Sequence, residues 1–319
     1  MDQQRFSGLS GALIRFLHHA DYAWFLPLLA RIPLSAGYFL ADLRGRLNAR
    51  LGRDWRSMAL GTRHVARQSA AGYRLLYPQT TEKEMAALVQ ERFKAESLEE
   101  FEGCLMAAGR IAKLQHEILP EVFLTTCKQR NGGMVLLTLH FESFLLGVLF
   151  LAQNGIKVNV MTSSVTRHPQ VARAVQNHFF NKYRGMERYL NGGKMLDMEE
   201  GLRPFYQLLK RGECLVVLAD APAVAGGAVA TPCFLGKQRQ LAGGALRLAQ
   251  KTDSAIGAFT CRLVTPGSYL VKGGPVLSSH NPQALDVIYR FLSDEIEATP
   301  GKWQAVDLLP LMTPIESGE

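Results

Sequence analysis

The residue with the clearest capacity for chemistry is His140, which follows an apolar run at residues 134–139. A neutral imidazole at a strand end can accept a proton from a hydroxyl or an amine, provided that a neighbouring group fixes its tautomer. Asp220 ends a second apolar run at residues 213–219, and Glu142 lies two positions after the histidine. These groups suit acyl transfer or hydrolysis. The alternative is a histidine that is only packed and hydrogen-bonded in a core.

Other kinds of catalytic site lack their signatures in this sequence. A serine hydrolase would need a strained Gly-x-Ser-x-Gly turn, and none is present. The eight histidines are scattered, so we expect neither a metal site nor a cofactor. The five cysteines have no Cys-x-x-Cys spacing, which indicates a reducing, cytoplasmic compartment. We interpret Cys233 as a small buried hydrophobic residue rather than a nucleophile.

The elements that must position His140 and Asp220 follow from an alternation of short apolar runs and helical patterns. We predict strands at 134–139, 157–162, 213–219, 255–264 and 269–277, and helices at 142–153, 168–182, 199–211, 241–251 and 282–298. This order predicts an α/β fold with a mainly parallel, helix-flanked sheet. Ligands of such sheets bind outside the carboxyl ends of the strands, where both residues would lie.

Residues 54–128 are predicted to be helical throughout. One helix should begin after Thr81, because Thr81 and Glu84 form a Thr-x-x-Glu capping box. The acidic residues that follow are expected to form a solvated face.

The first 80 residues carry most of the charge, with eleven arginines against four aspartates, hence +7 of the chain's +8. The apolar stretch 22–41 is long enough to span a membrane, but Arg31, Pro27 and Pro33 interrupt it. We therefore expect a kinked helical pair that dips into one anionic leaflet, with core helices of a soluble annex as the alternative. No signal peptide is expected, and no nucleic-acid-binding module is visible.

Four stretches occur in a recognisable series: LLTLHFESFLLG, VNVMTSSVTRHPQVARAVQ, the run from LKRGECLVVLAD through TPCFLGKQRQ to SAIGAF, and IEATPGKWQ. The first stretch resembles a strand followed by His-Phe-Gly-Asn-Trp-Glu, and the second resembles a strand followed by a basic residue and a helix. The third resembles a pair of blocks, Asp-Gln and Pro-Phe-Phe-Gly, and the fourth resembles a terminal Pro-x-x-Trp region. These are features of the bacterial lipid A biosynthesis (late) acyltransferases, within the lysophospholipid acyltransferase superfamily. The resemblance runs from about residue 20 to 305.

The resemblance implies an acyltransferase-type fold and transfer of an acyl group from a carrier-protein or coenzyme A thioester to a hydroxyl or amine of a lipid or amphiphilic acceptor. It implies a peripheral or monotopic protein on the cytoplasmic face of the bacterial inner membrane. The expected organisation is membrane-associating helices at 1–53, an acyltransferase-like domain at 54–312 and a disordered tail at 313–319. A catalytically silent lipid-binding or acyl-chain-binding protein of the same fold is the alternative.

His140 takes the place of the family's catalytic base, but Leu145 stands where the family has the acid of its His-x4-Asp/Glu pair. Three hypotheses follow. Glu142 replaces the acid from a non-helical turn, or Asp220 or a backbone carbonyl orients the ring, or catalysis has been lost.

The resemblance also implies residues that contact substrate. These candidates are Phe141, Ser143, Arg167, Phe234, Gly236, Lys237 and Arg239. Core packing is an equal alternative for Phe234, and a turn is the preferred interpretation of Gly236. The basic ones could hold a phosphate or carboxylate, or neutralise a developing oxyanion. Arg53 and Arg56 are predicted to contact an acidic acyl carrier protein.

Overall fold

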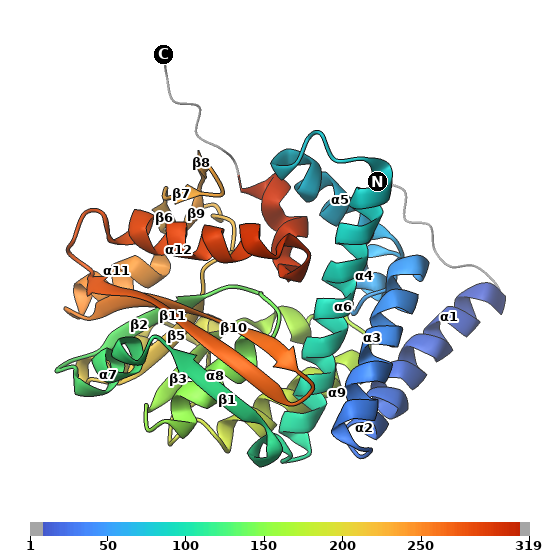
Figure 1. Cartoon of the computed structure of the whole chain (residues 1–319), viewed down its shortest axis with the longest axis horizontal. Coiled ribbons are helices and arrows are strands. Elements are labelled where there is room, and N and C mark those ends of the chain that lie inside the picture. Colours follow the sequence, from blue (N-terminus) through green and yellow to red (C-terminus); the bar gives the residue numbers. More distant parts are fainter. Residues whose placement is uncertain (1–8, 313–319) are drawn as a thin grey trace.

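A seven-stranded sheet forms the centre of the molecule, in a computed structural model that describes residues 9–312. Its order is β1-β11-β10-β2-β5-β3-β4, and every neighbouring pair is parallel except the β10–β11 hairpin (Figure 1). The strands are β1 (Gln115–Leu119), β2 (Met134–Thr138), β3 (Val158–Thr162), β4 (Met195–Asp197), β5 (Cys214–Leu218), β10 (Ala255–Thr265) and β11 (Ser268–Ser278). The predicted α/β class with a mainly parallel sheet is confirmed.

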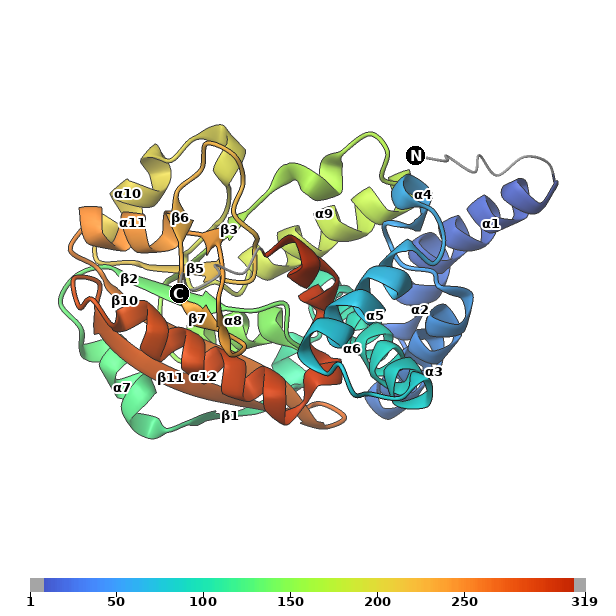
Figure 2. The ribbon, with the colours of Figure 1, turned by 90° about the horizontal axis from the view of Figure 1, so that it is seen from above.

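Helices cover both faces of this sheet. The longer ones are α1 (Leu9–Ala20), α3 (Leu34–Leu51), α5 (His64–Leu76), α6 (Glu82–Ala107), α7 (Glu121–Gln129), α8 (Phe144–Gln153), α9 (Arg173–Glu187), α10 (Arg203–Lys210), α11 (Gly244–Lys251) and α12 (Ala284–Ala298). Short elements include η1 (Asp21–Phe25), α2 (Leu26–Leu29), α4 (Ser57–Leu60), η3 (Ser164–Arg167), η5 (Pro300–Lys302) and η6 (Gln304–Leu311). Figure 2 shows η6 lying against α5.

Strand β2 shows why both faces of the sheet must be covered by helices. Met134 and Leu136 belong to the hydrophobic cluster beneath α8 and α9, whereas Val135 and Leu137 belong to the cluster beneath α10, α11 and α12. Successive side chains of a strand point to opposite faces, so an uninterrupted apolar run is what a strand buried on both sides requires. The same argument applies to β5.

The predicted elements after residue 133 are present, with ends that differ by a few residues. Two strands of the seven-stranded sheet, β1 and β4, were not predicted, and neither were four two-residue strands between residues 229 and 242. Residues 115–119, which form β1 at one edge of the sheet, have only Ile118 fully buried. An edge strand this polar carries no apolar alternation, so the prediction of continuous helix over 54–128 was wrong there. The capping box of α6 is confirmed, because the Glu84 N–H donates to Thr81 Oγ1.

The acidic residues of α6 form the predicted solvated face only at the start of the helix, where Glu82 and Glu84 are exposed. Glu96, Glu99, Glu100 and Glu102 are all buried. Three of them pair with cations: Arg92 of α6 itself lies 2.7 Å from Glu96, Arg44 of α3 lies 2.6 Å from Glu100 and Lys182 of α9 lies 2.8 Å from Glu99. A buried carboxylate is tolerated only when it is paired in this way, so these contacts fix α3 and α9 against α6.

The same pairing accounts for part of the N-terminal positive charge. Arg53 contacts Asp21 and Asn48, and Arg56 lies 2.9 Å from Asp54 and 2.8 Å from Asp307. Both guanidinium groups are largely buried. The prediction that these two arginines contact a carrier protein is therefore not supported by their position.

The N-terminal helices share the hydrophobic cluster of the rest of the chain. Tyr22, Leu29 and Tyr38 are buried with Phe101 of α6, and Figure 1 shows α1, α2 and α3 stacked beside α6 at one end of the molecule. Within residues 9–312 no helix combines the length and apolar character needed to cross a bilayer. The boundary predicted at residue 53 stays a prediction, and the predicted tail at 313–319 lies outside the described residues.

Large apolar side chains are exposed on these helices. Leu13, Phe16, Leu17, Trp24, Leu28, Phe39, Leu43, Leu47 and Leu51 are all exposed. Phe39, Leu43, Leu47 and Leu51 recur every four residues, which places them on one side of α3. We call this set of nine residues the apolar face.

Candidate active site

Two neighbouring parallel strands bring His140 and Asp220 together. Thr138 at the end of β2 is in register with Leu218 at the end of β5, and the Ala219 N–H donates to the Thr138 carbonyl at 2.7 Å. His140 and Asp220 each lie two residues beyond this pair. His140 Nδ1 is 2.9 Å from Asp220 Oδ1, and the His140 backbone N–H donates to Asp220 Oδ2 at 2.8 Å.

A third donor completes the surroundings of Asp220. Trp303 donates from Nε1 to Asp220 Oδ2 at 2.9 Å. Asp220 is fully buried, whereas the His140 side chain is 37% exposed. The carboxylate is therefore fixed inside the protein and one edge of the imidazole remains accessible. The structure does not show the entirely buried histidine that would argue for packing alone.

The electrostatics of the pair favour a charged Asp220. Burial acts to raise the pKa of Asp220, but His140 and the hydrogen bonds from Trp303 and the His140 N–H hold it below its ordinary 3.8. Burial acts to lower the pKa of His140, but the charge and hydrogen bond of Asp220 outweigh it, and that pKa lies above 6.5. An ionised carboxylate next to Nδ1 favours a proton on that nitrogen, which leaves the lone pair on Nε2.

Glu142, the other candidate to orient His140, has no hydrogen bond to the His140 ring among the described residues. It lies in the predicted non-helical turn, with a φ of 43°, but its carboxylate is 2.9 Å from Lys302 Nζ. The Glu142 N–H donates to the Lys302 carbonyl, and the Gln304 N–H donates to the His140 carbonyl. Residues 302–304 thus pair with residues 140–142, and this pairing holds Glu142 against Lys302 and Trp303 against Asp220.

Phe141 and Ser143, predicted to contact substrate, are instead fully buried. Ser143 Oγ donates to Glu102 Oε1 at 2.8 Å, and Tyr269 donates to the same oxygen at 2.9 Å. Burial raises the pKa of Glu102 well above its ordinary value, which favours the protonated carboxyl. These side chains support the turn after His140 from beneath, and no part of them is open to a ligand.

Phe234 and Arg239 also belong to the interior. Phe234 packs edge-on against Trp303 and Tyr289, with ring centroids 5.7 and 5.4 Å away. Arg239 is buried and donates to the carbonyl oxygens of Phe234 and Met312. They therefore have a structural role instead of the predicted contact with substrate. Phe234 packs against Trp303, which in turn donates a hydrogen bond to Asp220.

The remaining predicted positions lie at the surface. Gly236 occupies the turn between β7 (Cys233–Phe234) and β8 (Lys237–Gln238) with a φ of 73°, which glycine adopts without strain. Lys237 is exposed, and Arg167 is exposed and paired with Asp197. Cys233 is exposed, so its interpretation as a buried residue was wrong.

Sequence reasoning did not assign roles to Trp303, Lys302 and Glu102. The PGKWQ stretch was recognised only as part of a series of blocks. Trp303 lies 83 positions from Asp220 in the chain. No local pattern indicates such a pairing, because it depends on how η5 and η6 pack onto α5 and α6.

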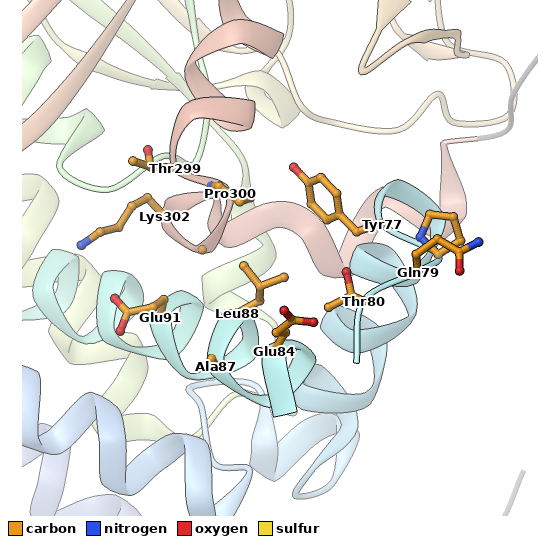
Figure 3. Close-up of a pocket in the computed structure, with 12 residues that line it drawn as sticks. Tyr77, Gln79, Thr80, Glu84, Ala87, Leu88, Glu91, Thr299, Pro300 and Lys302 are labelled. Carbon is orange, nitrogen blue, oxygen red and sulfur yellow. The ribbon is translucent and has the colours of Figure 1, made fainter. Parts of the chain in front are cut away.

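One hollow of the described part of the chain lies near the candidate site, but His140 does not line it. It is an open groove of about 880 Å3 between α6 and the turn at residues 299–302. Figure 3 shows Ala87, Leu88 and Glu91 along one wall, with Thr299, Pro300 and Lys302 opposite. Of the candidate-site residues described above, only Lys302 lines this groove. The candidate site is therefore identified by the geometry of its side chains and not by a cavity.

Comparison with known proteins identifies the family. The model of the bacterial lipid A biosynthesis acyltransferases matches residues 22–305. The chain belongs to this family. This acyltransferase therefore acts on a lipid acceptor, and its family is membrane-associated in bacteria.

A solved structure similar to this acyltransferase is that of the 1-acyl-sn-glycerophosphate (LPA) acyltransferase PlsC from Thermotoga maritima. The sequences are 13% identical, and the match covers 83% of this chain and 98% of that chain with a TM-score of 0.37. No curated protein matches this acyltransferase.

Proposed function

We propose that this acyltransferase moves an acyl group from a thioester of acyl carrier protein or coenzyme A to a hydroxyl or amine of a membrane lipid. His140 is the general base and Asp220 is the residue that orients it. The observation that supports this proposal is the hydrogen bond between His140 Nδ1 and a buried, charged Asp220, which leaves Nε2 on the accessible side of the ring.

The proposed step needs only these groups and the two substrates. Nε2 removes the proton of the acceptor as its oxygen or nitrogen attacks the thioester carbonyl carbon. The tetrahedral intermediate then expels the thiolate, and the imidazolium returns its proton to sulfur. Asp220 stabilises the imidazolium throughout, as an aspartate does in a hydrolase triad. Arg167 and Lys237 are exposed cations that could hold an anionic group of the acceptor.

A direct assay tests this proposal. Full-length protein is incubated with an isotope-labelled acyl thioester, on carrier protein or on coenzyme A, together with bacterial lipid extract. We expect lipids that carry the labelled acyl group, with one free thiol released per transfer, measured by mass spectrometry and thiol titration. Free thiol and free fatty acid without acylated lipid would show hydrolysis, and no turnover with either donor would contradict the proposal.

The apolar face is the part of the molecule that we assign to the membrane, as a peripheral attachment on the cytoplasmic leaflet. Large apolar side chains exposed together over adjacent helices mark an interaction surface. Trp24 suits the interface, and Arg15 and Arg50 lie exposed on the same helices, where they can meet anionic lipid. The membrane association of the family favours a leaflet over a protein partner.

We expect Leu43→Ser/Leu47→Ser to weaken binding to anionic vesicles about tenfold or more. Both side chains are about half exposed, and burying each in lipid contributes on the order of 1 kcal/mol. Vesicle co-sedimentation measures the loss. The control Val122→Ser/Val264→Ser removes two exposed apolar residues from α7 and β10. If both double variants lose binding equally, the apolar face is not the attachment surface.

A further inference from the structure

A second hollow, of about 790 Å3, lies between α9, the end of α6 and the segment from η1 to the turn after α2. Neither His140 nor Asp220 lines it, so it is separate from the candidate active site. Small residues form much of its wall and keep it open: Ala23, Ala30, Gly103, Ala107, Ala108 and Ala174. We call it the basic cavity, because four arginines line it.

Four arginines line this cavity: Arg31, Arg173, Arg184 and Arg188. None of them forms an ion pair with a carboxylate of residues 9–312, and no aspartate or glutamate lines the hollow. All four are exposed. Like charges held together repel one another, so this arrangement favours a bound anion.

Three of these arginines lie on one side of α9 or just beyond its end. Arg173, Asn177, Asn181, Arg184 and Arg188 follow at intervals of three or four residues, which places them along a single helix face. The face therefore offers amide and guanidinium N–H donors in a row. Guanidinium groups bind phosphate oxygens with paired hydrogen bonds, so phosphate suits this donor set well.

His178 gives a second, independent indication of a ligand. It lines the cavity, is 6% exposed, and its Nε2 has no hydrogen-bond partner among the described residues. Its Nδ1 is 3.6 Å from the Cys104 sulfur. Burial raises the pKa of Cys104 to about 12, so the thiol keeps its proton and can donate it to Nδ1. The imidazole proton is then on Nε2, a buried donor without a partner on a residue that lines the cavity.

The position of the cavity indicates an amphiphilic ligand. Ala23 and Pro27 line it, and their chain neighbours Trp24 and Leu28 belong to the exposed apolar face. A phosphate held by the arginines would thus lie at the border of the surface assigned to the membrane. The neighbouring apolar surface would contribute nothing to the binding of a free anion. A lipid, in contrast, can place its acyl chains in the leaflet and its phosphate in the cavity.

We propose that the basic cavity binds the phosphate group of an anionic membrane lipid, at a site separate from the site of acyl transfer. This lipid is held in addition to the acceptor, and the site goes beyond the proposed function. It anchors the protein beside its apolar face through defined contacts rather than through net charge alone.

Calorimetric titration of the full-length protein with dihexanoyl phosphatidate, below its micelle concentration, tests the site. We expect Arg173→Gln/Arg184→Gln to bind at least about tenfold more weakly than wild type. The control Arg203→Gln/Arg247→Gln removes the same charge from exposed positions on α10 and α11, outside the cavity, and should change affinity less than about twofold. His140→Ala should bind like wild type.

Each other result overturns the proposal. Equal losses in the two double variants would mean that net charge alone attracts the lipid. Inorganic phosphate binding as tightly as phosphatidate would make this a site for a free anion. Loss of binding in His140→Ala would place the lipid in the active site, and no binding by wild type would leave the cavity without this ligand. Activity is not the readout, so the outcome is independent of the proposed acyl transfer.

Discussion

Replacing His140 by alanine should lower the rate of acyl transfer by about 1,000-fold or more while leaving the fold intact. General-base catalysis contributes about 100- to 10,000-fold, and no other imidazole among the described residues is bonded to Asp220. The side chain is partly exposed, so its loss leaves no large buried cavity. Initial rates with the labelled thioester measure the effect, and circular dichroism checks the fold.

A matched control is present in the same chain. His280 Nε2 is 2.9 Å from Asp253 Oδ1 on the exposed surface, so it is also a histidine paired with an aspartate. His280→Ala should keep the wild-type rate. If His140→Ala is as active as this control, His140 is not the base and the proposed mechanism fails.

The pH dependence of wild type follows from the raised pKa of His140. A general base must be neutral, so kcat/KM should increase with pH and level off above a pKa that itself lies above 6.5. The stability effect has the opposite sign. A pKa raised by folding adds stability that is full below 6.5 and is lost as pH rises through the folded value. His140→Ala should lose this contribution.

Much of the fold could be predicted because its signals are local. The apolar runs that become β2 and β5 are buried on both faces of the sheet, and His140 and Asp220 follow the carboxyl ends of these two neighbouring strands. Strand β1 was missed because an edge strand is half solvated and its residues Gln115, His116 and Glu117 are polar. Glu99 and Glu100 of α6 were misjudged because their cationic partners come from α9 and α3, which the sequence of α6 does not reveal.

Of the candidate site, the sequence could predict only the residues that follow the ends of strands, His140 and Asp220. Both Glu142 and Asp220 were candidates to orient His140, because a turn can place either carboxylate near the ring. The choice is made by residues 302–304, which pair with the turn and draw Glu142 to Lys302. That contact joins segments about 160 residues apart, so neither propensity nor spacing could indicate it. For the same reason the burial of Phe141 and Ser143 was not foreseen.

These contacts support our proposal that the chain works without an acid at Leu145. Leu145 is buried in α8. The orienting carboxylate comes from the neighbouring strand instead, with Trp303 donating to its second oxygen and Phe234 packed behind Trp303. A carboxylate that accepts several hydrogen bonds stays ionised despite burial. The tautomer of His140 therefore depends on the end of β5 and on the segment after α12, not on the helix that follows His140.

Asp220→Asn should lower kcat by about 1,000- to 10,000-fold, the size of loss measured when the orienting aspartate of a hydrolase triad is replaced by asparagine. Asparagine keeps the shape and can still accept from Trp303 and the His140 N–H. It lacks the charge that raises the pKa of His140, so the rise of the residual kcat/KM with pH should move to lower pH. A purely structural role would lower the rate without moving that profile.

Glu142→Gln is the paired experiment, because it makes the same change in the carboxylate nearest to His140 in the sequence. Its partner is Lys302, so we expect a loss of a few-fold at most and an unchanged pH profile. The reverse result, with Glu142→Gln inactive and Asp220→Asn active, would assign the orienting role to Glu142. Thermal melting of both variants separates a loss of folded protein from a loss of catalysis, since only the latter leaves the melting temperature close to that of wild type.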